Sequence, residues 1–503
     1  MRIPDHHTLI LRLAAGGLIL AVITSHCVLR AQEPSQALTA RLDRMQQQLD
    51  ATQRQLEEYR SALQSLQQRM QAMAPADAQI CGTSSRTSAA DMQQAVAELR
   101  EQQSVQQAEI AVHEQAKVET RSRYNLKIGG LALFNGFEND GTVDSIDVPV
   151  IAVRGTPGNS THSVGASMRQ SLITLDATGP QFWGAHSYAN VQMDFFGGLS
   201  TADYTSTAGT MRMRAASVQT DWPELSIHAG LDRLLISQLS PTSYASIGEP
   251  AMAWSGNLWA WVPQLTAEKA LNLSDSRQFL LAAALADIPD PGPDSSQYLR
   301  TASAAEKSRY PGVEARTGYS WSANHASGVG VSGYFSPHDY GRSGKVDAWA
   351  ALVDWHLMLP GRFALSGEAY KGQALGGLGG GAFKDVGNAY HYNESYGAQL
   401  TGDEGLRDEG GWAQLKFHPT SLLEFNGAFG QDNDTAAQLR ATDISTGNPY
   451  SGLARNQTFL GNVVFRPRAS FLLSLEYRKL RSWQLIGPLN RAQIFGLAAG
   501  YEF

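Results

Sequence analysis

The sequence predicts an all-β transmembrane barrel of about 16 antiparallel strands, preceded by an α-helical coiled coil. Three observations predict this class: a short apolar run near the N-terminus, a heptad repeat after it, and alternation with period 2 from Arg123 onward. Hydrophobic residues make up 43% of the 503 residues, yet the mean hydropathy is −0.26. The apolar run Leu13 to Ile23 is shorter than the roughly 18 residues of a membrane helix, which argues against a helical membrane protein.

Residues 1–31 have the three regions of a secretory signal peptide. Arg2 and Arg12 precede the apolar run, and cleavage is expected after Ala31. The alternative, a short anchor helix, is disfavoured by the length of the run. Cleavage removes Cys27 and leaves Cys81 as the one cysteine, so no intrachain disulfide is expected.

Residues 36–74 carry a coiled-coil heptad from Leu38 to Met73, where apolar residues follow alternating steps of four and three. A lone amphipathic helix on a globular core would show a wider apolar stripe. Leucine at one core position permits two, three or four strands. The residues expected in the oligomerisation core are Leu42, Leu49, Leu56, Leu63, Leu66 and Met70.

A linker over residues 75–91 begins at Pro75, and a weaker heptad over residues 92–120 predicts a second short helical or coiled-coil segment. The linker contains Cys81. Copies of Cys81 would pair between chains if they met near an oligomer axis in an oxidising compartment, whereas an exposed free thiol is the alternative.

Residues 124–503 alternate apolar and polar side chains in segments of strand length, as in Phe471 to Tyr477. This alternation predicts one face in lipid and one in water. The expected strands lie near 125–135, 166–177, 186–196, 210–220, 224–232, 261–269, 278–286, 311–321, 327–335, 346–357, 362–371, 410–418, 421–430, 457–466, 470–480 and 492–503.

The connections between these strands alternate between compact turns, such as Leu359-Pro360-Gly361, and mostly longer loops, such as 136–163. Short turns on one side and long loops on the other are typical of an outer-membrane barrel, and disfavour a soluble β-sandwich or propeller. The last strand places Phe495, Tyr501 and the terminal Phe503 on one face. Tyr501 and Phe503 are the expected assembly signal.

No catalytic, cofactor or metal site is expected. Gly328 to Gly333 has the GxGxxG spacing but lies in a strand pattern with no helix after it, so it offers no phosphate cradle. The Gly-rich stretch Gly376 to Gly381 is expected to be a flexible loop. Ser226, His228 and Asp232 share one face of a strand, which does not build a nucleophile with its base. The net charge of −7 gives no support for a nucleic-acid partner.

The inward face carries charges of both signs, so the alternation leaves ion selectivity open, and some inward pairs are expected to be structural bridges. Loop 233–260 is expected to narrow the lumen, with Arg212 and Arg214 favouring anions. The alternatives are an outward loop at an oligomer interface and a constriction by loop 372–409. The candidate pore-lining residues are Arg212, Arg214, Arg233, Glu249, Arg316, Lys416, Arg466 and Arg478.

The terminal Tyr501-Glu502-Phe503 resembles the assembly signal of bacterial outer-membrane proteins. Several segments behind the predicted coil resemble the DcaP-like porins: Arg169 to Asp176, Asn190 to Gly198, Met211 to Arg214 and Ser474 to Arg478. The resemblance is spread over most of 124–503. It implies a trimeric outer-membrane channel with 16-stranded protomers, a periplasmic coiled coil and diffusive uptake of small, often anionic solutes.

We therefore expect a passive, non-enzymatic diffusion channel for small hydrophilic solutes in the bacterial outer membrane. Its expected partners are outer-membrane lipid, the barrel assembly machinery and further copies of the chain in a homotrimer. Two alternatives remain: a barrel that anchors a coiled coil toward the cell wall, and an outer-membrane barrel enzyme. Single-channel conductance separates the first alternative from a channel.

Overall fold

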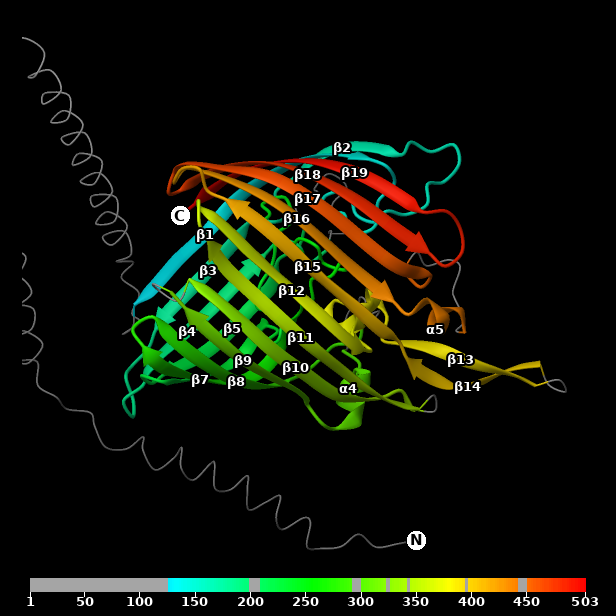
Figure 1. Ribbon diagram of the computed structural model, residues 1–503, viewed down its shortest axis with the longest axis horizontal. Helices are drawn as coiled ribbons and strands as arrows, with labels where there is room; N and C mark the ends of the chain where they lie inside the picture. The colour runs from blue at the N-terminus through cyan, green and yellow to red at the C-terminus, as the bar shows by residue number, and fades with distance from the viewer. Residues whose placement is uncertain are drawn as a thin grey trace, which may run out of the picture. The chain divides into compact units, whose positions relative to one another are not determined.

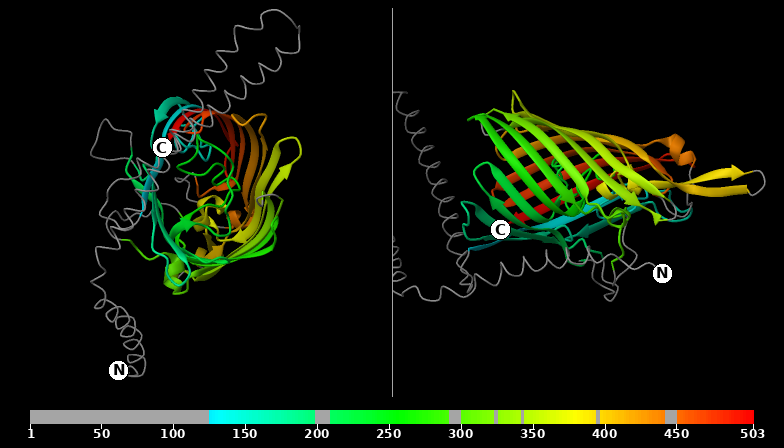
Figure 2. Two further views of the ribbon diagram at one scale, coloured as in Figure 1. Left: turned by 90° about the vertical axis from the view of Figure 1, so that its left-hand side faces the viewer. Right: turned by 90° about the horizontal axis from the view of Figure 1, so that it is seen from below.

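The computed structural model describes residues 125–503 except 199–208, 292–299, 323–325, 342–343, 394–396 and 442–449. These residues form one closed antiparallel β-barrel, which confirms the predicted fold class (Figures 1 and 2). The barrel has 16 strand positions built from 17 strands, because β2 and β3 pair with successive parts of β1. The last strand, β19, pairs with β1 and closes the sheet. The expected signal peptide, coiled coil, linker and second helical segment lie outside the described residues.

Most strands begin and end close to where the alternation predicted them, but the strand expected near 166–177 is divided into β2 and β3, which both pair with β1. In chain order they are β1 (Leu126–Asp140), β2 (His162–Ser167), β3 (Leu172–Thr178), β4 (His186–Asp194), β5 (Arg212–Asp221), β6 (Leu225–Arg233), β7 (Trp261–Ser274), β8 (Arg277–Ala286), β9 (Gly312–Trp321), β10 (Ser327–Asp339), β11 (Lys345–Leu359), β12 (Phe363–Gln373), β15 (Arg407–Phe417), β16 (Leu423–Asp434), β17 (Leu453–Arg468), β18 (Phe471–Gln484) and β19 (Asn490–Glu502).

Short turns join the strands at one end of the barrel, the turn end, and mostly longer connections join them at the other, the loop end. The loop end carries the hairpin β13 (Val386–Asn393) and β14 (Gly397–Gly405), which projects beyond the barrel in Figure 1. It also carries four short helices, which are α4 (Ala304–Ser308), η3 (Gly376–Leu378), η4 (Gly381–Phe383) and α5 (Ala436–Arg440). None of the helices in the described part of the chain is long and apolar enough to cross a membrane.

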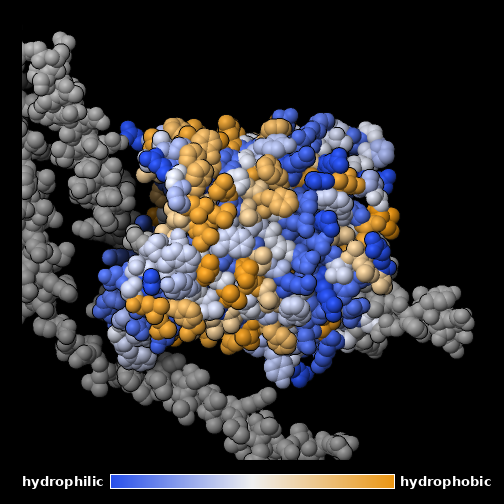
Figure 3. Space-filling model, viewed as in Figure 1, coloured by the Kyte–Doolittle hydropathy of each residue, from blue (hydrophilic) through white to orange (hydrophobic). Residues whose placement is uncertain are grey.

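The outer face of the strands is apolar, as the period of 2 requires for a wall in lipid. Val331, Phe429 and Leu475 are each at least 50% exposed, whereas the residues on either side of each of them in its strand point inward and are buried. Figure 3 shows hydrophobic residues gathered over the strands and hydrophilic residues toward the loop end. The exterior therefore has the surface of a membrane barrel.

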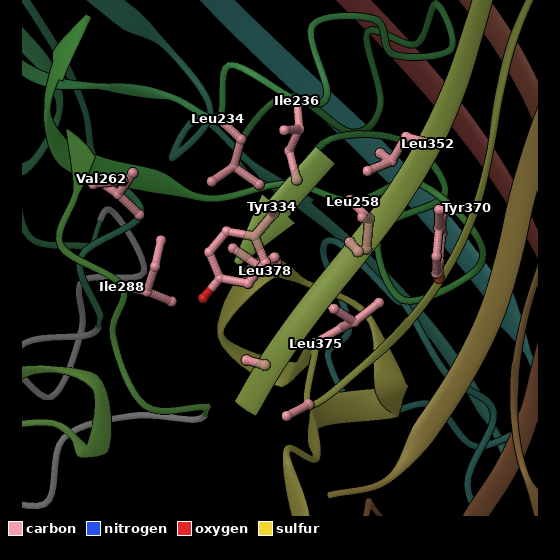
Figure 4. Packing of buried hydrophobic residues seen from close by; sticks show 14 of the residues in the cluster. Leu234, Ile236, Leu258, Val262, Ile288, Tyr334, Leu352, Tyr370, Leu375 and Leu378 are labelled. Atoms are coloured by element: carbon pink, nitrogen blue, oxygen red, sulfur yellow. The ribbon is translucent and has the colours of Figure 1, made fainter. Parts of the chain in front are cut away.

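The largest apolar cluster lies inside the barrel and not between two sheets. Leu234, Ile236 and Leu258 come from the β6–β7 connection, and Leu375 and Leu378 come from the β12–β13 connection (Figure 4). They pack against inward wall residues that include Tyr334, Leu352 and Tyr370. Two connections thus enter the lumen and bury their own core there.

Candidate channel constriction

The β6–β7 connection, residues 234–260, folds into the barrel and is held by inward side chains of distant strands. Glu368 on β12 accepts hydrogen bonds from the Ser237 hydroxyl (2.7 Å) and the Leu239 amide (3.0 Å). Glu314 on β9 accepts from the Ile236 amide at 2.9 Å. These hydrogen bonds fix the position of the loop, because moving it away would leave buried carboxylate oxygens without a donor, which is costly.

Further bonds fix the middle of this loop to the opposite wall. Asn462 on β17 donates to the Thr242 carbonyl at 2.7 Å, and Asn135 on β1 donates to the Tyr244 carbonyl at 2.7 Å. The base of the loop is closed by the Ser237 hydroxyl, whose one proton is shared between Glu368 and the Leu258 carbonyl oxygen, which is 2.7 Å away. The loop therefore crosses the lumen and does not point outward. This agrees with the expectation from the sequence that loop 233–260 narrows the lumen.

The other expected constriction, loop 372–409, meets the first one inside the barrel. Trp254 stacks on Phe383 with ring centroids 3.5 Å apart, and the Trp259 amide donates to the Leu378 carbonyl at 2.8 Å. The β1–β2 connection joins them with Ile151, whose exposure is 0%. The two connections expected as alternative constrictions are therefore in contact inside the barrel. The β1–β2 connection was missed because its apolar residues show no regular period.

The stretch Gly376 to Gly381 is buried and ordered into η3 and η4, so the expectation of a flexible loop was wrong. A Cβ atom on Gly377 would lie 2.3 Å from the Pro289 carbonyl oxygen, and one on Gly379 would lie 2.6 Å from the Trp259 carbonyl oxygen. Glycine is needed here for close packing of the backbone and not for freedom of movement.

Three arginines form a cluster beside the inserted loop, and two aromatic rings separate them. The Arg169 guanidinium lies 4.2 Å from the Phe196 ring centroid, and that of Arg212 lies 5.5 Å from the same centroid. Arg212 and Arg214 lie 5.2 and 4.5 Å from the Trp261 ring centroid. Rings between like charges stabilise both by cation–π attraction. We call Arg169, Arg212 and Arg214 the arginine cluster.

Two carboxylates neutralise part of this cluster. Asp194 forms a bidentate pair with Arg212 (3.1 and 2.7 Å), and Asp147 pairs with Arg169 at 2.8 Å. The Arg214 Nε is 3.6 Å from Asp194, beyond hydrogen-bond distance, and its Nη1 has no hydrogen-bond partner among the described residues. A buried guanidinium with unpaired N–H groups is suited to receive a carboxylate or phosphate oxygen.

Glu249 lies in the inserted loop close to this cluster. Burial, followed by the charge of Asp144, raises the pKa of Glu249 to about 7, although Arg212 lowers it. Its carboxylate is therefore partly protonated near neutral pH. Arg212, Arg214 and Glu249 were predicted from the sequence, whereas Arg169 was missed. The strand expected near 166–177 is interrupted in the structure, and Arg169 lies in the break between β2 and β3.

The remaining predicted cations point inward but are held in pairs. Arg316 forms a bidentate pair with Asp354 (3.0 and 2.7 Å), and Lys416 lies 3.2 Å from Glu424. The other pairs are Arg466 with Glu502 (3.0 Å) and Arg478 with Glu476 (3.0 Å). Arg233 donates to the Ser240 hydroxyl at 2.8 Å. Strand parity located these side chains, whereas their pairing depends on cross-strand register and loop contacts.

A polar cavity of about 240 Å³ lies between the start of the inserted loop and the wall of β6 and β7. Its lining includes His228, Asp232, Gln264, Thr266 and Glu268. Ser226, on the same face as His228, donates its hydroxyl hydrogen bond to Asp221. This serine is therefore paired with a carboxylate and not with the neighbouring histidine.

The two expected assembly residues lie at the seam of the barrel. Tyr501 and Phe503 are 54% and 59% exposed on the outer face. The Phe503 amide donates to the Gly130 carbonyl at 3.1 Å, and the Gly130 amide donates back at 3.0 Å. The predicted oligomerisation residues Leu42, Leu49, Leu56, Leu63, Leu66 and Met70 lie outside the described residues.

No protein-family model and no curated protein matches the sequence. In structure, the chain is similar to the outer membrane channel DcaP of Acinetobacter baumannii, with a TM-score of 0.55 and 13% identity over 76% of this chain and 99% of that chain. Weaker likenesses are an anion-selective porin from Comamonas acidovorans (TM-score 0.45, 9% identity, 76% and 100% covered) and OprB of Pseudomonas putida (TM-score 0.46, 8% identity, 75% and 94% covered). The likeness to DcaP confirms the resemblance at the level of the barrel fold.

Proposed function

We propose that this protein is an outer-membrane porin, a passive and non-enzymatic diffusion channel for small hydrophilic solutes, anions among them. It works without a catalytic residue or a cofactor. It assembles as a homotrimer after insertion by the barrel assembly machinery, and its coiled coil extends into the periplasm. The outer face meets outer-membrane lipid, and the lumen carries the solutes.

The observation that carries this proposal is the loop 234–260, which is anchored across the lumen by Glu314, Glu368 and Asn462. A loop held at fixed points inside a closed barrel narrows the pore at a defined place. The polar cavity beside β6 and β7 lies between Gln238 at the start of the loop and the barrel wall. We place the solute path on this side.

The arginine cluster supports a preference for anions. It brings three guanidinium groups against two directly paired carboxylates, and Arg214 retains unpaired N–H groups. A site with excess positive charge in a low-dielectric wall concentrates anions and repels cations. The other inward cations are paired and contribute little to selectivity. Arg212, Arg214 and Glu249 therefore set the ion preference.

Two other functions are less well supported. A barrel that only anchors a coiled coil needs a sealed lumen and would give no conductance steps. A barrel enzyme needs a nucleophile beside its base, and the Ser226 hydroxyl bonds Asp221 instead of His228.

The test is to shorten the inserted loop and measure single-channel conductance in planar bilayers. Residues 241–253 are replaced by two glycines, since the Ser237–Leu258 hydrogen bond holds the ends of the loop together. We expect the unaltered protein to give discrete conductance steps and the shortened loop to give larger ones. The control is removal of residues 390–400 from the β13–β14 hairpin, which is expected to leave the step size unchanged. The strands of this hairpin project beyond the barrel (Figure 1).

A protein without conductance steps would contradict the channel and favour the anchor. Equal steps from the full and the shortened loop would show that residues 241–253 do not constrict the pore. Clear cation preference in reversal potentials would contradict the role given to the arginine cluster.

A further inference from the structure

Three buried carboxylates converge inside the barrel near its loop end. Asp408 on β15 lies opposite Asp434 on β16, and Asp432 lies two residues earlier on the same face of β16. One oxygen from each carboxylate lies within 4.8 Å of the corresponding oxygens of the other two. All three side chains belong to residues that are at most 2% exposed. No metal site was expected from the sequence, since it carries none of the known metal-binding motifs.

The groups around these carboxylates leave part of their charge unbalanced. Lys384 Nζ lies 2.9 Å from Asp434, the Tyr370 hydroxyl donates to Asp432 at 2.9 Å, and the Gly381 amide donates to Asp408 at 2.8 Å. Three ionised carboxylates against one ammonium leave two negative charges. Buried charges are costly unless they are paired or bind a metal ion.

The second observation is that oxygen atoms of this cluster have no partner. Asp408 Oδ1, Asp432 Oδ1 and Asp434 Oδ1 are buried and accept no hydrogen bond from any described residue. Lys384 is already engaged by the carbonyl oxygens of Ala382 (3.0 Å) and Leu453 (2.9 Å). The unpaired oxygens therefore need a different partner, and a divalent cation would balance the charge.

We propose that Asp408, Asp432 and Asp434 bind one Ca²⁺ ion. Calcium takes oxygen ligands at about 2.3 to 2.6 Å, so two ligands on opposite sides of the ion lie about 4.6 to 5.2 Å apart. The three oxygens all lie within 4.8 Å of one another, so one ion could contact all three. The smaller Mg²⁺ ion prefers to keep several waters and to take only one or two carboxylates, which favours calcium here. This site does not depend on the proposed channel function.

The ion would fasten an inserted segment to the barrel wall. Gly381 and Lys384 both belong to the connection that enters the lumen, and both contact the carboxylate cluster. Lys384 also reaches the Tyr450 carbonyl at 3.2 Å, which joins the β16–β17 connection to the same point. Ca²⁺ is thus expected to raise the temperature at which the folded barrel melts.

The experiment is calorimetric titration of the full-length protein, purified in detergent and stripped with EGTA, with CaCl₂ and separately with MgCl₂. We expect one Ca²⁺ per chain and at least tenfold weaker Mg²⁺ binding. Asp432→Asn is expected to weaken Ca²⁺ binding at least tenfold. The matched control is Glu409→Gln, because Glu409 follows Asp408 on β15, faces outward and is 59% exposed, so its loss leaves binding unchanged.

Tb³⁺ luminescence provides a readout that does not need an altered carboxylate. A Tb³⁺ ion in the site would be excited through Tyr370, whose hydroxyl bonds Asp432, and added Ca²⁺ would quench the emission by displacing it. Absence of saturable Ca²⁺ binding by the unaltered protein would overturn the proposal. Ca²⁺ binding as tight in Asp432→Asn and Asp408→Asn as in the unaltered protein would also overturn it, and equal affinity of the unaltered protein for Ca²⁺ and Mg²⁺ would overturn the choice of calcium.

Discussion

Arg214 is the member of the arginine cluster whose charge is least compensated by its neighbours. Its Nη1 is buried without a hydrogen-bond partner, and its nearest carboxylate, Asp194, is bound in a bidentate pair by Arg212. The free energy of an anion near this guanidinium is therefore set by direct charge attraction, on the order of 4 kcal/mol at about 4 Å near a protein surface.

Replacing this arginine with a neutral side chain is expected to reduce anion preference. Arg214→Gln should lower the anion-to-cation permeability ratio several-fold, as measured by reversal potentials under a salt gradient. Arg455→Gln is the control, since Arg455 is exposed on the outer face of β17 and should leave the ratio unchanged. If the two variants gave the same ratio, the selectivity would have to come from elsewhere in the lumen.

Glu249 makes the ion preference depend on pH. Its pKa of about 7 is raised mainly by burial, so the carboxylate gains a proton as the pH falls through neutrality and the negative charge beside Arg212 disappears. Anion preference should therefore rise between pH 8.5 and pH 5.5 in reversal-potential measurements. Glu249→Gln should show the low-pH preference at both values. An unaltered pH dependence in this variant would assign the titration to another group.

At the residue scale, the sequence located side chains better than it located their partners. The period of 2 placed Arg212, Arg316 and Arg478 on the inner wall, because strand parity is a local property. It did not reveal that Arg316 pairs with Asp354, since that contact depends on how β9, β10 and β11 align. Arg169 fell within the strand expected near 166–177, but that strand is divided into β2 and β3, so strand parity did not place this side chain.

At the scale of elements, the inserted connections depend on close backbone packing. The η3–η4 segment lies against the end of loop 234–260, and at Gly379 the two backbones leave no room for a side chain. Gly379 has φ +82°, and a Cβ atom there would lie 2.6 Å from the Trp259 carbonyl oxygen. Gly487 also has a positive φ (+111°) but has no atom within 4 Å of a Cβ position.

These two glycines form a matched pair for alanine substitution. Gly487→Ala should cost about 1 kcal/mol of folding free energy for the left-handed backbone alone. Gly379→Ala should cost about 1 to 3 kcal/mol more, because the two connections must separate. The temperature at which each variant loses its compact folded form on gels measures both of these costs. Equal melting of the two variants would show that the η3–η4 segment does not need its contact with Trp259.

The sequence predicted where connections lie but not how each one folds. Loop 233–260 was expected to enter the lumen from its position as the third long connection, and it does. The Gly-rich stretch was misread because glycine marks flexible loops and tight packing alike, and the sequence alone does not separate them. The apolar residues of 148–152 carry no period, since they pack as an irregular segment against Leu453 and Trp254.

At the scale of the whole molecule, the number of strands could be predicted because two features are regular. Side chains alternate between apolar and polar along each strand, and a closed antiparallel sheet of 16 positions leaves no unpaired edge in the membrane. The seam is completed by the mutual hydrogen bonds of Phe503 and Gly130. Because one chain closes its own barrel, each protomer is expected to hold a complete pore, and oligomerisation is a separate property of the chain.

That separation gives a test of the coiled coil. Leu49→Asp with Leu56→Asp places charges in the predicted core of the coiled coil, where burying a charge is costly. This double variant should dissociate the homotrimer into monomers, which native mass spectrometry would detect. Gln47→Asp with Ser61→Asp, on the opposite face of the heptad, is the control and should keep the trimer. The conductance of each pore should be the same in both variants, because β1 pairs with β19 within one chain. A trimer that survived the core charges would show that barrel walls, and not the coil, hold the protomers together.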